Sequence, residues 1–237
     1  MSENTPVTTL DIDLGCVARN LNRVREQINS KGVICVIKAF GYGTDDIALA
    51  KLLQKQGVEY LAVSCADEGV RLREAGVKSR ILILNPDNST FDNLVENNLE
   101  PTLLSIKHLE AYVVWAEKRG CEGLPVHINI NTGMNRLGFE VSGLLEIERI
   151  IAESDLTVAT VYSHLAGSDD NCFDGKTLKK SGDGYLIEFS SAVDAVRCGI
   201  KLQKTISEFN SNKDEIREIF DGFENIEDEE NEEIVDL

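Results

Sequence analysis

The residue best placed to do chemistry is Lys38, which ends the apolar run of residues 33–37. A run of Val and Ile of this length is typical of a strand that is buried on both faces. Burial disfavours the ammonium form and lowers the pKa of a lysine, as an amine that attacks a carbonyl requires. Parallel α/β folds also place their chemistry at the carboxyl ends of strands. The alternative is that Lys38 simply extends past the strand end into solvent.

Two further side chains with chemical potential follow later segments. Arg136 lies in a glycine-bounded loop, and His164 ends an apolar run. An arginine keeps its charge at any working pH and binds oxygen anions with a planar fork, whereas a histidine exchanges protons near neutral pH. Arg136 can equally be a solvated loop charge, and His164 can be a core histidine. His108 and His127, within a helical and a strand pattern, are interpreted as structural.

The elements that would position these residues alternate in type along the chain. Strand-like segments are expected at residues 8–14, 33–38, 60–64, 80–84, 100–104, 125–130 and 156–163. Helical segments are expected at residues 14–29, 45–56, 66–75, 91–97, 106–119 and 142–153. This rhythm predicts a parallel sheet, either a barrel or an open doubly wound fold. Seven strand-like segments by residue 163 favour a barrel that lacks its last strand and closing helix.

Charge and cysteine content limit the function classes. The net charge of −17 argues against nucleic acid or an anionic membrane as a partner. Residues 214–237 hold twelve acids and one arginine, a net of −11, which leaves −6 for residues 1–213. Six cysteines without CxxC spacing, and no apolar run that could span a bilayer, lead us to expect a cytoplasmic protein with reduced thiols.

Several motifs in one order carry a resemblance. They are Thr9-Leu10-Asp11-Ile12-Asp13-Leu14, Val36-Ile37-Lys38-Ala39-Phe40-Gly41-Tyr42-Gly43, Asn131-Thr132-Gly133-Met134-Asn135-Arg136-Leu137-Gly138-Phe139 and Tyr162-Ser163-His164-Leu165-Ala166. Over about residues 7–170 the chain thereby resembles the alanine racemase family. Asp67-Glu68-Gly69, Asn85-Pro86 and Leu99-Glu100-Pro101 are most similar to the racemase that is fused to a peptidoglycan ligase in some bacteria. Motifs that match in order are far more specific than any one alone.

The resemblance implies a pyridoxal phosphate isomerase on a (β/α)8 barrel, which interconverts L- and D-alanine as a homodimer. By this match Lys38 forms the Schiff base and acts as one of two bases. Tyr42 binds the cofactor phosphate, and His164 lies beside the pyridine ring. Arg136 faces the phenolic oxygen of the cofactor and helps to hold the substrate. The cofactor would be the electron sink, and the protein would orient it.

The chain also departs from the family pattern. Asn129 stands where the family commonly has a carbamylated lysine that supports the substrate arginine, and Asn131 stands where an aspartate is usual. The pattern ends near Asp170, before the serine that binds the phosphate, the arginine that faces the pyridine nitrogen and the tyrosine that is the second base. We therefore expect weak retention of the cofactor and little racemisation.

A second resemblance covers about residues 173–212, which are similar to the central hairpin and following helix of class III nucleotide cyclases. By this match Asp183 would bind Mg or Mn together with a nucleotide, and Lys179 would contact the purine. The alternative is that Gly182-Asp183-Gly184 is only a hairpin turn. A third possibility is a non-catalytic chimera of the two families.

Together these patterns predict an α/β protein that contains an incomplete, TIM-like (β/α)8 barrel of the pyridoxal-phosphate-binding type. Residues 1–170 are expected to form the truncated barrel. Residues 171–213 would form a cyclase-like hairpin and helix that pack beside it, and residues 214–237 an acidic, partly disordered tail.

Overall fold

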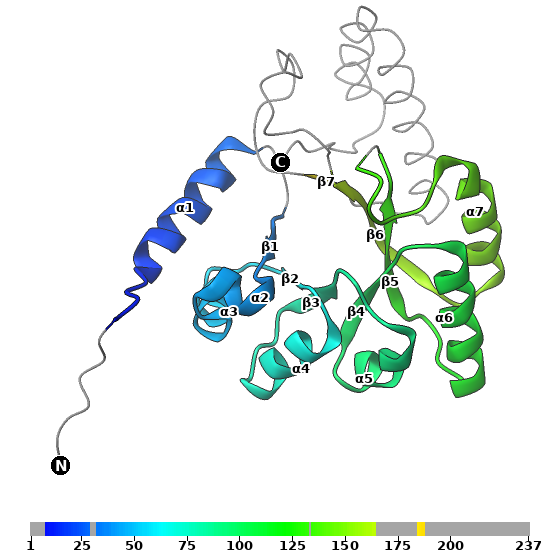
Figure 1. The fold of residues 1–237 in the computed structure, drawn as a ribbon, viewed down its shortest axis with the longest axis horizontal. Coiled ribbons are helices and arrows are strands. Elements are labelled where there is room, and N and C mark those ends of the chain that lie inside the picture. Colours follow the sequence, from blue (N-terminus) through cyan, green and yellow to red (C-terminus); the bar gives the residue numbers. More distant parts are fainter. Residues whose placement is uncertain (1–7, 29–31, 133, 165–183, 188–237) are drawn as a thin grey trace, which may run out of the picture.

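A computed structural model describes residues 8–28, 32–132, 134–164 and 184–187. Its strands form one sheet, in the order in which they occur along the chain. Six of them are parallel, and Figure 1 shows them curling into a half-barrel. They are β1 (Ile34–Val36), β2 (Tyr60–Val63), β3 (Arg80–Ile83), β4 (Leu99–Leu103), β5 (Pro125–Ile130) and β6 (Thr157–His164).

Helices follow the strands along the chain, and Figure 1 shows α3 to α7 on the outer side of the curled sheet. The helices are α1 (Leu14–Gln27), α2 (Lys38–Gly43), α3 (Asp46–Lys55), α4 (Ala66–Glu74), α5 (Phe91–Glu96), α6 (Ile106–Arg119) and α7 (Leu144–Glu153), with 3-10 turns η1 (Asn88–Thr90) and η2 (Val141–Gly143). Asp13, Asp45 and Ser105 begin α1, α3 and α6 by accepting hydrogen bonds from free backbone N–H groups. Within the described residues, no helix combines the length and the apolar character that crossing a membrane requires.

Two strand predictions near the amino terminus are wrong. Residues 8–13 form no strand, because the chain turns into α1 and the Asp13 carboxylate accepts hydrogen bonds from Gly15 and Cys16. The described chain therefore has six strands by His164 rather than seven. The strand before Lys38 is also not buried on both faces. Val36 is 40% exposed, since β1 has β2 as its only described neighbour in the sheet.

The last described strand, β7 (Gly184–Ile187), runs antiparallel to β6 and pairs His164 with Gly184 and Val161 with Ile187. The sequence predicts a hairpin beside an incomplete barrel, and an eighth parallel strand would count against that prediction. Within the described residues the added strand is antiparallel. Asp183 and Lys179, the two cyclase-like candidates, lie outside the described residues. The described residues also hold no cluster of three His, Cys, Asp or Glu side chains that could bind a metal ion.

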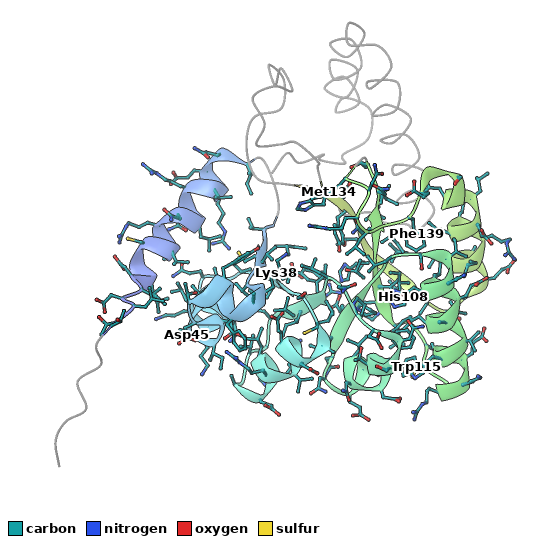
Figure 2. The ribbon with its side chains drawn as sticks, viewed as in Figure 1. Lys38, Asp45, His108, Trp115, Met134 and Phe139 are labelled. Atoms are coloured by element: carbon teal, nitrogen blue, oxygen red, sulfur yellow. The ribbon has the colours of Figure 1, made fainter. Side chains whose placement is uncertain are left out.

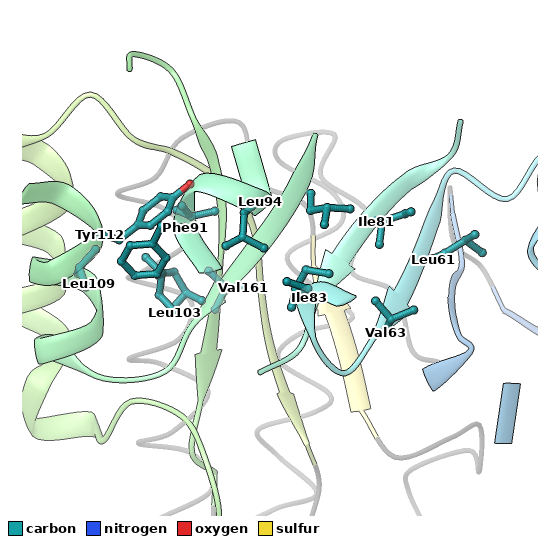
Figure 3. Packing of buried hydrophobic residues seen from close by; sticks show 14 of the residues in the cluster. Leu61, Val63, Ile81, Ile83, Phe91, Leu94, Leu103, Leu109, Tyr112 and Val161 are labelled. Atoms are coloured by element: carbon teal, nitrogen blue, oxygen red, sulfur yellow. The ribbon is translucent and has the colours of Figure 1, made fainter. Parts of the chain in front are cut away.

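The hydrophobic core lies between the sheet and the outer helices. Alternate strand residues such as Leu61, Val63, Ile81 and Ile83 point outward and are fully buried against the helical layer, as Figure 3 shows. The intervening residues face the interior of the half-barrel, where Tyr60, Ala62 and Leu82 form a second, smaller apolar cluster. Burial on the outer side thus fixes which strand residues face the interior.

A polar network on the inner face is centred on Glu100. The Glu100 carboxylate accepts two hydrogen bonds from Arg80, at 2.7 and 2.9 Å, and one of 2.9 Å from the Tyr60 hydroxyl. His127 Nε2 lies 3.1 Å from the same carboxylate, and His127 Nδ1 lies 2.6 Å from Thr160 Oγ1. Tyr60 and Arg80 are the first residues of their strands, so this network lies toward the amino ends, away from Lys38. Its position predicts a role in stability.

Candidate functional site

Lys38 is held at the carboxyl end of β1. The strand ends at Val36, but the N–H of buried Ile37 still donates to the Ala62 carbonyl of β2 at 2.9 Å, so pairing with the sheet continues to the residue before the lysine. The Lys38 side chain is half-buried (Figure 2). Lys38 is thus fixed at the rim of the half-barrel, where parallel α/β folds place their chemistry.

The element α2, which begins at Lys38, is a left-handed helical turn rather than a right-handed helix. Ala39, Phe40, Gly41 and Tyr42 have φ angles of 53, 54, 65 and 57° and ψ angles of 41–53°. Such a turn costs L-residues roughly 1–2 kcal/mol each, and three of the four are not glycine. Strain of this kind persists only where the surrounding structure enforces it, and it is concentrated at functional sites.

The turn closes on itself and packs against α3. Hydrogen bonds of 3.0 Å join the Gly41 N–H to the Ile37 carbonyl and the Thr44 N–H to the Phe40 carbonyl. A Cβ at Gly41 would lie 2.7 Å from Leu49 Cδ1, so only glycine allows this contact. Tyr42 follows at the end of the turn with 64% of its surface exposed. The sequence does not predict this left-handed turn.

The loop after β5 carries Arg136 and is organised by Asn131. The Asn131 amide donates to Asn135 Oδ1 at 3.0 Å and to Glu140 Oε1 at 2.7 Å, and its Oδ1 accepts the Asn135 N–H at 3.0 Å. An aspartate, which the resemblance makes usual here, could not donate to Glu140. Arg136 is exposed and makes no hydrogen bond or ion pair within the described part of the chain. With no partner among the described residues, its guanidinium can bind an anionic group.

Asn129 presents an unusual acceptor on the inner face. The residue is 7% exposed, and its Oδ1 is buried without a hydrogen-bond partner among the described residues. In β6, Tyr162 pairs with Asn129, and His164 follows on the same face at the end of the strand. A buried acceptor left unpaired costs roughly 1–3 kcal/mol, so a group that donates a hydrogen bond to Asn129 Oδ1 would be stabilised there. This polar, incomplete inner face fits a polar ligand better than an apolar one.

The candidate residues thus share one end of the sheet. Lys38 and Tyr42 follow β1, Arg136 follows β5, and His164 ends β6. Figure 2 labels Lys38 and Met134, which lies in the loop that carries Arg136. No hydrogen bond or ion pair joins the four side chains to one another within the residues that the structure covers. A cofactor that bridges the rim could contact them from separate strands.

Sequence reasoning missed two parts of this site, the left-handed turn and the side chains of α4 that touch it. Asp67-Glu68-Gly69 was noted only as a motif detail. In the structure the Glu68 carboxylate accepts hydrogen bonds from two backbone amides, one of them next to Lys38. A glutamate at the third position of an expected helix was the available signal, but its Ala39 partner is distant in sequence.

Several known proteins are similar to this chain in sequence and in fold. The family described as "Alanine racemase, N-terminal domain" matches residues 12–213. An alanine racemase of Clostridium perfringens is 32% identical over 187 residues, 78% of this chain and 47% of the relative. One of Carboxydothermus hydrogenoformans is 33% identical over 163 residues, covering 68% of this chain and 44% of the relative. The structure of alanine racemase from Clostridium difficile 630 in complex with cycloserine aligns with a TM-score of 0.62 and 26% identity, over 82% of this chain and 49% of the other.

The match also changes the expected extent of the resemblance. It continues past Asp170, where the sequence pattern was expected to end, through the segment that resembles cyclases. The comparisons give that cyclase resemblance no support. The match ends at residue 213, just before the acidic stretch. The chain spans about half the length of the curated relatives it matches.

Proposed function

The chain belongs to the alanine racemase family, and from this premise we propose that it holds pyridoxal phosphate at Lys38 and belongs to the chemistry that interconverts L- and D-alanine. The observation that carries the proposal is the left-handed turn that begins directly after Lys38. Three strained L-residues beside the one amine at the end of β1 are hard to explain as packing alone. The turn is explained if it fixes the direction of the Lys38 amine toward the cofactor.

The other residues fit the cofactor by their chemistry. Tyr42 would supply a hydroxyl for the phosphate. Arg136 has no partner among the described residues, and its charge would bind the phenolic oxygen of the cofactor and the substrate carboxylate. His164, at the end of β6, would lie beside the pyridine ring. When bound, the cofactor would withdraw electrons from the substrate Cα. Lys38 Nζ would take or return the Cα proton on one face.

Asn129 is suited to orient Arg136 in place of the carbamylated lysine that the family commonly has. Its unpartnered Oδ1 can accept one N–H of a guanidinium, which would satisfy the buried acceptor. A neutral amide provides weaker electrostatic support than a charged carbamate. We therefore expect this chain to hold the substrate carboxylate less tightly than a relative with that group.

In the family the base on the opposite face of Cα is a tyrosine of the C-terminal domain, and this chain spans about half the length of the curated relatives it matches. We propose that Lys38 supplies the base on one face of Cα, so exchange of the Cα proton on that face is the part of the chemistry assigned to these residues.

The test of cofactor binding is a titration with pyridoxal phosphate, followed by borohydride reduction and peptide mass spectrometry. Condensation of the amine with the aldehyde releases water, and borohydride then supplies hydride, so the added mass marks the modified lysine. We expect the mass on Lys38, its loss in Lys38→Ala, and its retention when the exposed α3 lysine is replaced in Lys51→Ala. Labelling spread equally over surface lysines in the wild-type chain would refute the assignment.

A further inference from the structure

Two side chains on one face of α4 contact the left-handed turn. Glu68 and Arg71 are three residues apart and therefore project from adjacent turns of the helix toward the same side. Only two residues separate the end of β2 from the start of α4, so the first turns of α4 lie at the strand ends, next to Lys38. The two residues have different partners there.

Glu68 joins the two strand ends through one carboxylate. Its Oε1 accepts the Ala39 N–H at 2.7 Å, and its Oε2 accepts the Ser64 N–H at 2.6 Å. The Ala39 N–H belongs to the peptide plane that also contains the Lys38 Cα and carbonyl. Holding this N–H therefore fixes the orientation of the peptide from which the Lys38 side chain departs.

Arg71 holds the next part of the turn. Its guanidinium carbon lies 4.4 Å from the centroid of the Phe40 ring, and the same group is ion-paired with the Asp46 carboxylate. Asp46 is almost fully buried, and its Oδ1 also accepts the Ile47 N–H at 2.9 Å, so Arg71 is itself anchored by the start of α3. The electron-rich face of an aromatic ring attracts a cation placed over it, so Arg71 and the Phe40 ring attract each other. Phe40 is thereby held although 58% of its surface is exposed.

We propose that Glu68 is a positioning residue for Lys38, which holds the left-handed turn in the conformation that aims the amine at its aldehyde partner, with Arg71 holding Phe40 in support. The inference rests on the proposed function of Lys38. Without these contacts, L-residues in a left-handed conformation would relax to ordinary backbone angles. The Lys38–Ala39 peptide would rotate, and the amine would lose its fixed direction.

The chemistry of the contact makes the prediction sharp. Both donors are backbone N–H groups, so the side chain must accept at both of its oxygens. Glutamine has nearly the same shape but one acceptor, and its amide nitrogen would face an N–H donor. Glu68→Gln is therefore expected to fail, although it conserves shape. Glu74→Gln makes the same charge change at an exposed position on the same helix and serves as the matched control.

The first measurement is amide hydrogen exchange of Ala39 and Ser64 in the full chain without cofactor. In Glu68→Gln and Glu68→Ala we expect exchange at both amides to rise by about tenfold or more, as the loss of a charge-assisted hydrogen bond implies. Glu74→Gln should match the wild type. Circular dichroism establishes that each variant keeps its helices.

The second measurement is the pyridoxal phosphate concentration needed for half-maximal borohydride capture at Lys38. We expect it to rise about tenfold or more in both Glu68 variants and not in Glu74→Gln. Unchanged exchange at Ala39, or faster exchange with unchanged capture at Lys38, would overturn the inference. If even the wild-type chain captures no cofactor at Lys38, the proposed function fails, and the exchange data then decide separately whether Glu68 holds the turn.

Discussion

Replacing Glu100 tests how the half-barrel tolerates a polar interior. In Glu100→Ala the Tyr60 hydroxyl and the His127 Nε2–H lose their acceptor inside the barrel. A buried donor left unpaired costs roughly 1–3 kcal/mol. The Arg80 side chain is 44% exposed and can turn its charge to water, so it adds little. We therefore expect the free energy of unfolding to fall by about 2–5 kcal/mol.

The protonation states of Glu100 and His127 support the expected loss of unfolding free energy. Burial raises the pKa of Glu100, but hydrogen bonds from His127 and Arg80 outweigh it and leave the pKa below its usual value. Burial lowers the pKa of His127, more than Glu100 raises it. Glu100 is thus ionised and His127 neutral near pH 7, with Nε2–H donating to Glu100 and Nδ1 accepting from Thr160. The His127–Glu100 contact is a hydrogen bond rather than an ion pair.

The assay is urea unfolding, followed by the fluorescence of the single tryptophan, Trp115, which packs against Phe91 and Tyr112. Glu100→Gln keeps the volume but offers one acceptor in place of two, so its loss should be intermediate. Glu59→Ala, at the exposed position before Tyr60, is the control and should stay within about 0.5 kcal/mol of the wild type. If Glu100→Ala also unfolds within that margin at an unchanged urea slope, the network does not stabilise the fold and our reasoning is wrong.

Two further predictions concern the same inner face. Unfolding free energy should fall as pH drops below about 6.5, because burial lowers the pKa of both His127 and His108, so the unfolded chain protonates them before the folded chain does. It should fall again below about 4.5, because the pKa of Glu100 is also lower in the folded chain. Urea midpoints at about pH 7.5 and about pH 5.5 measure the first step, and His127→Gln should reduce it to the share of His108; equal midpoints in the wild type would contradict the assignment. Gly138→Ala should destabilise the chain and weaken cofactor capture, since φ is 111° and the new Cβ would lie 2.8 Å from Asn131 N. Gly123→Ala, with φ of 65° and open space around its Cβ, carries only backbone strain and should unfold closer to the wild type; if the two glycine variants were equally stable, the contact at Asn131 would be irrelevant.

Local patterning determined much of the fold. The strand at Pro125–Ile130 and the helix at Ile106–Arg119 lie where the sequence predicted them, because apolar periodicity and capping are read within a few residues. Lys38 at the end of β1 and His164 at the end of β6 follow from the same local signals. The two histidines interpreted as structural are indeed buried, His127 inside the half-barrel and His108 stacked on Phe91.

Long-range contacts decided the rest. In the left-handed turn the Ala39 N–H donates to Glu68, about one β/α unit away in sequence, and no local propensity of Ala, Phe or Tyr favours the turn. The acceptor role of Glu100 exists only because the curled sheet places residues of three other strands around one carboxylate. The first strand is partly exposed because its position at the sheet edge, not its composition, sets its burial. Sequence alone determined which residues could react; the tertiary structure decided which way they face, because orientation is fixed by partners that are distant along the chain.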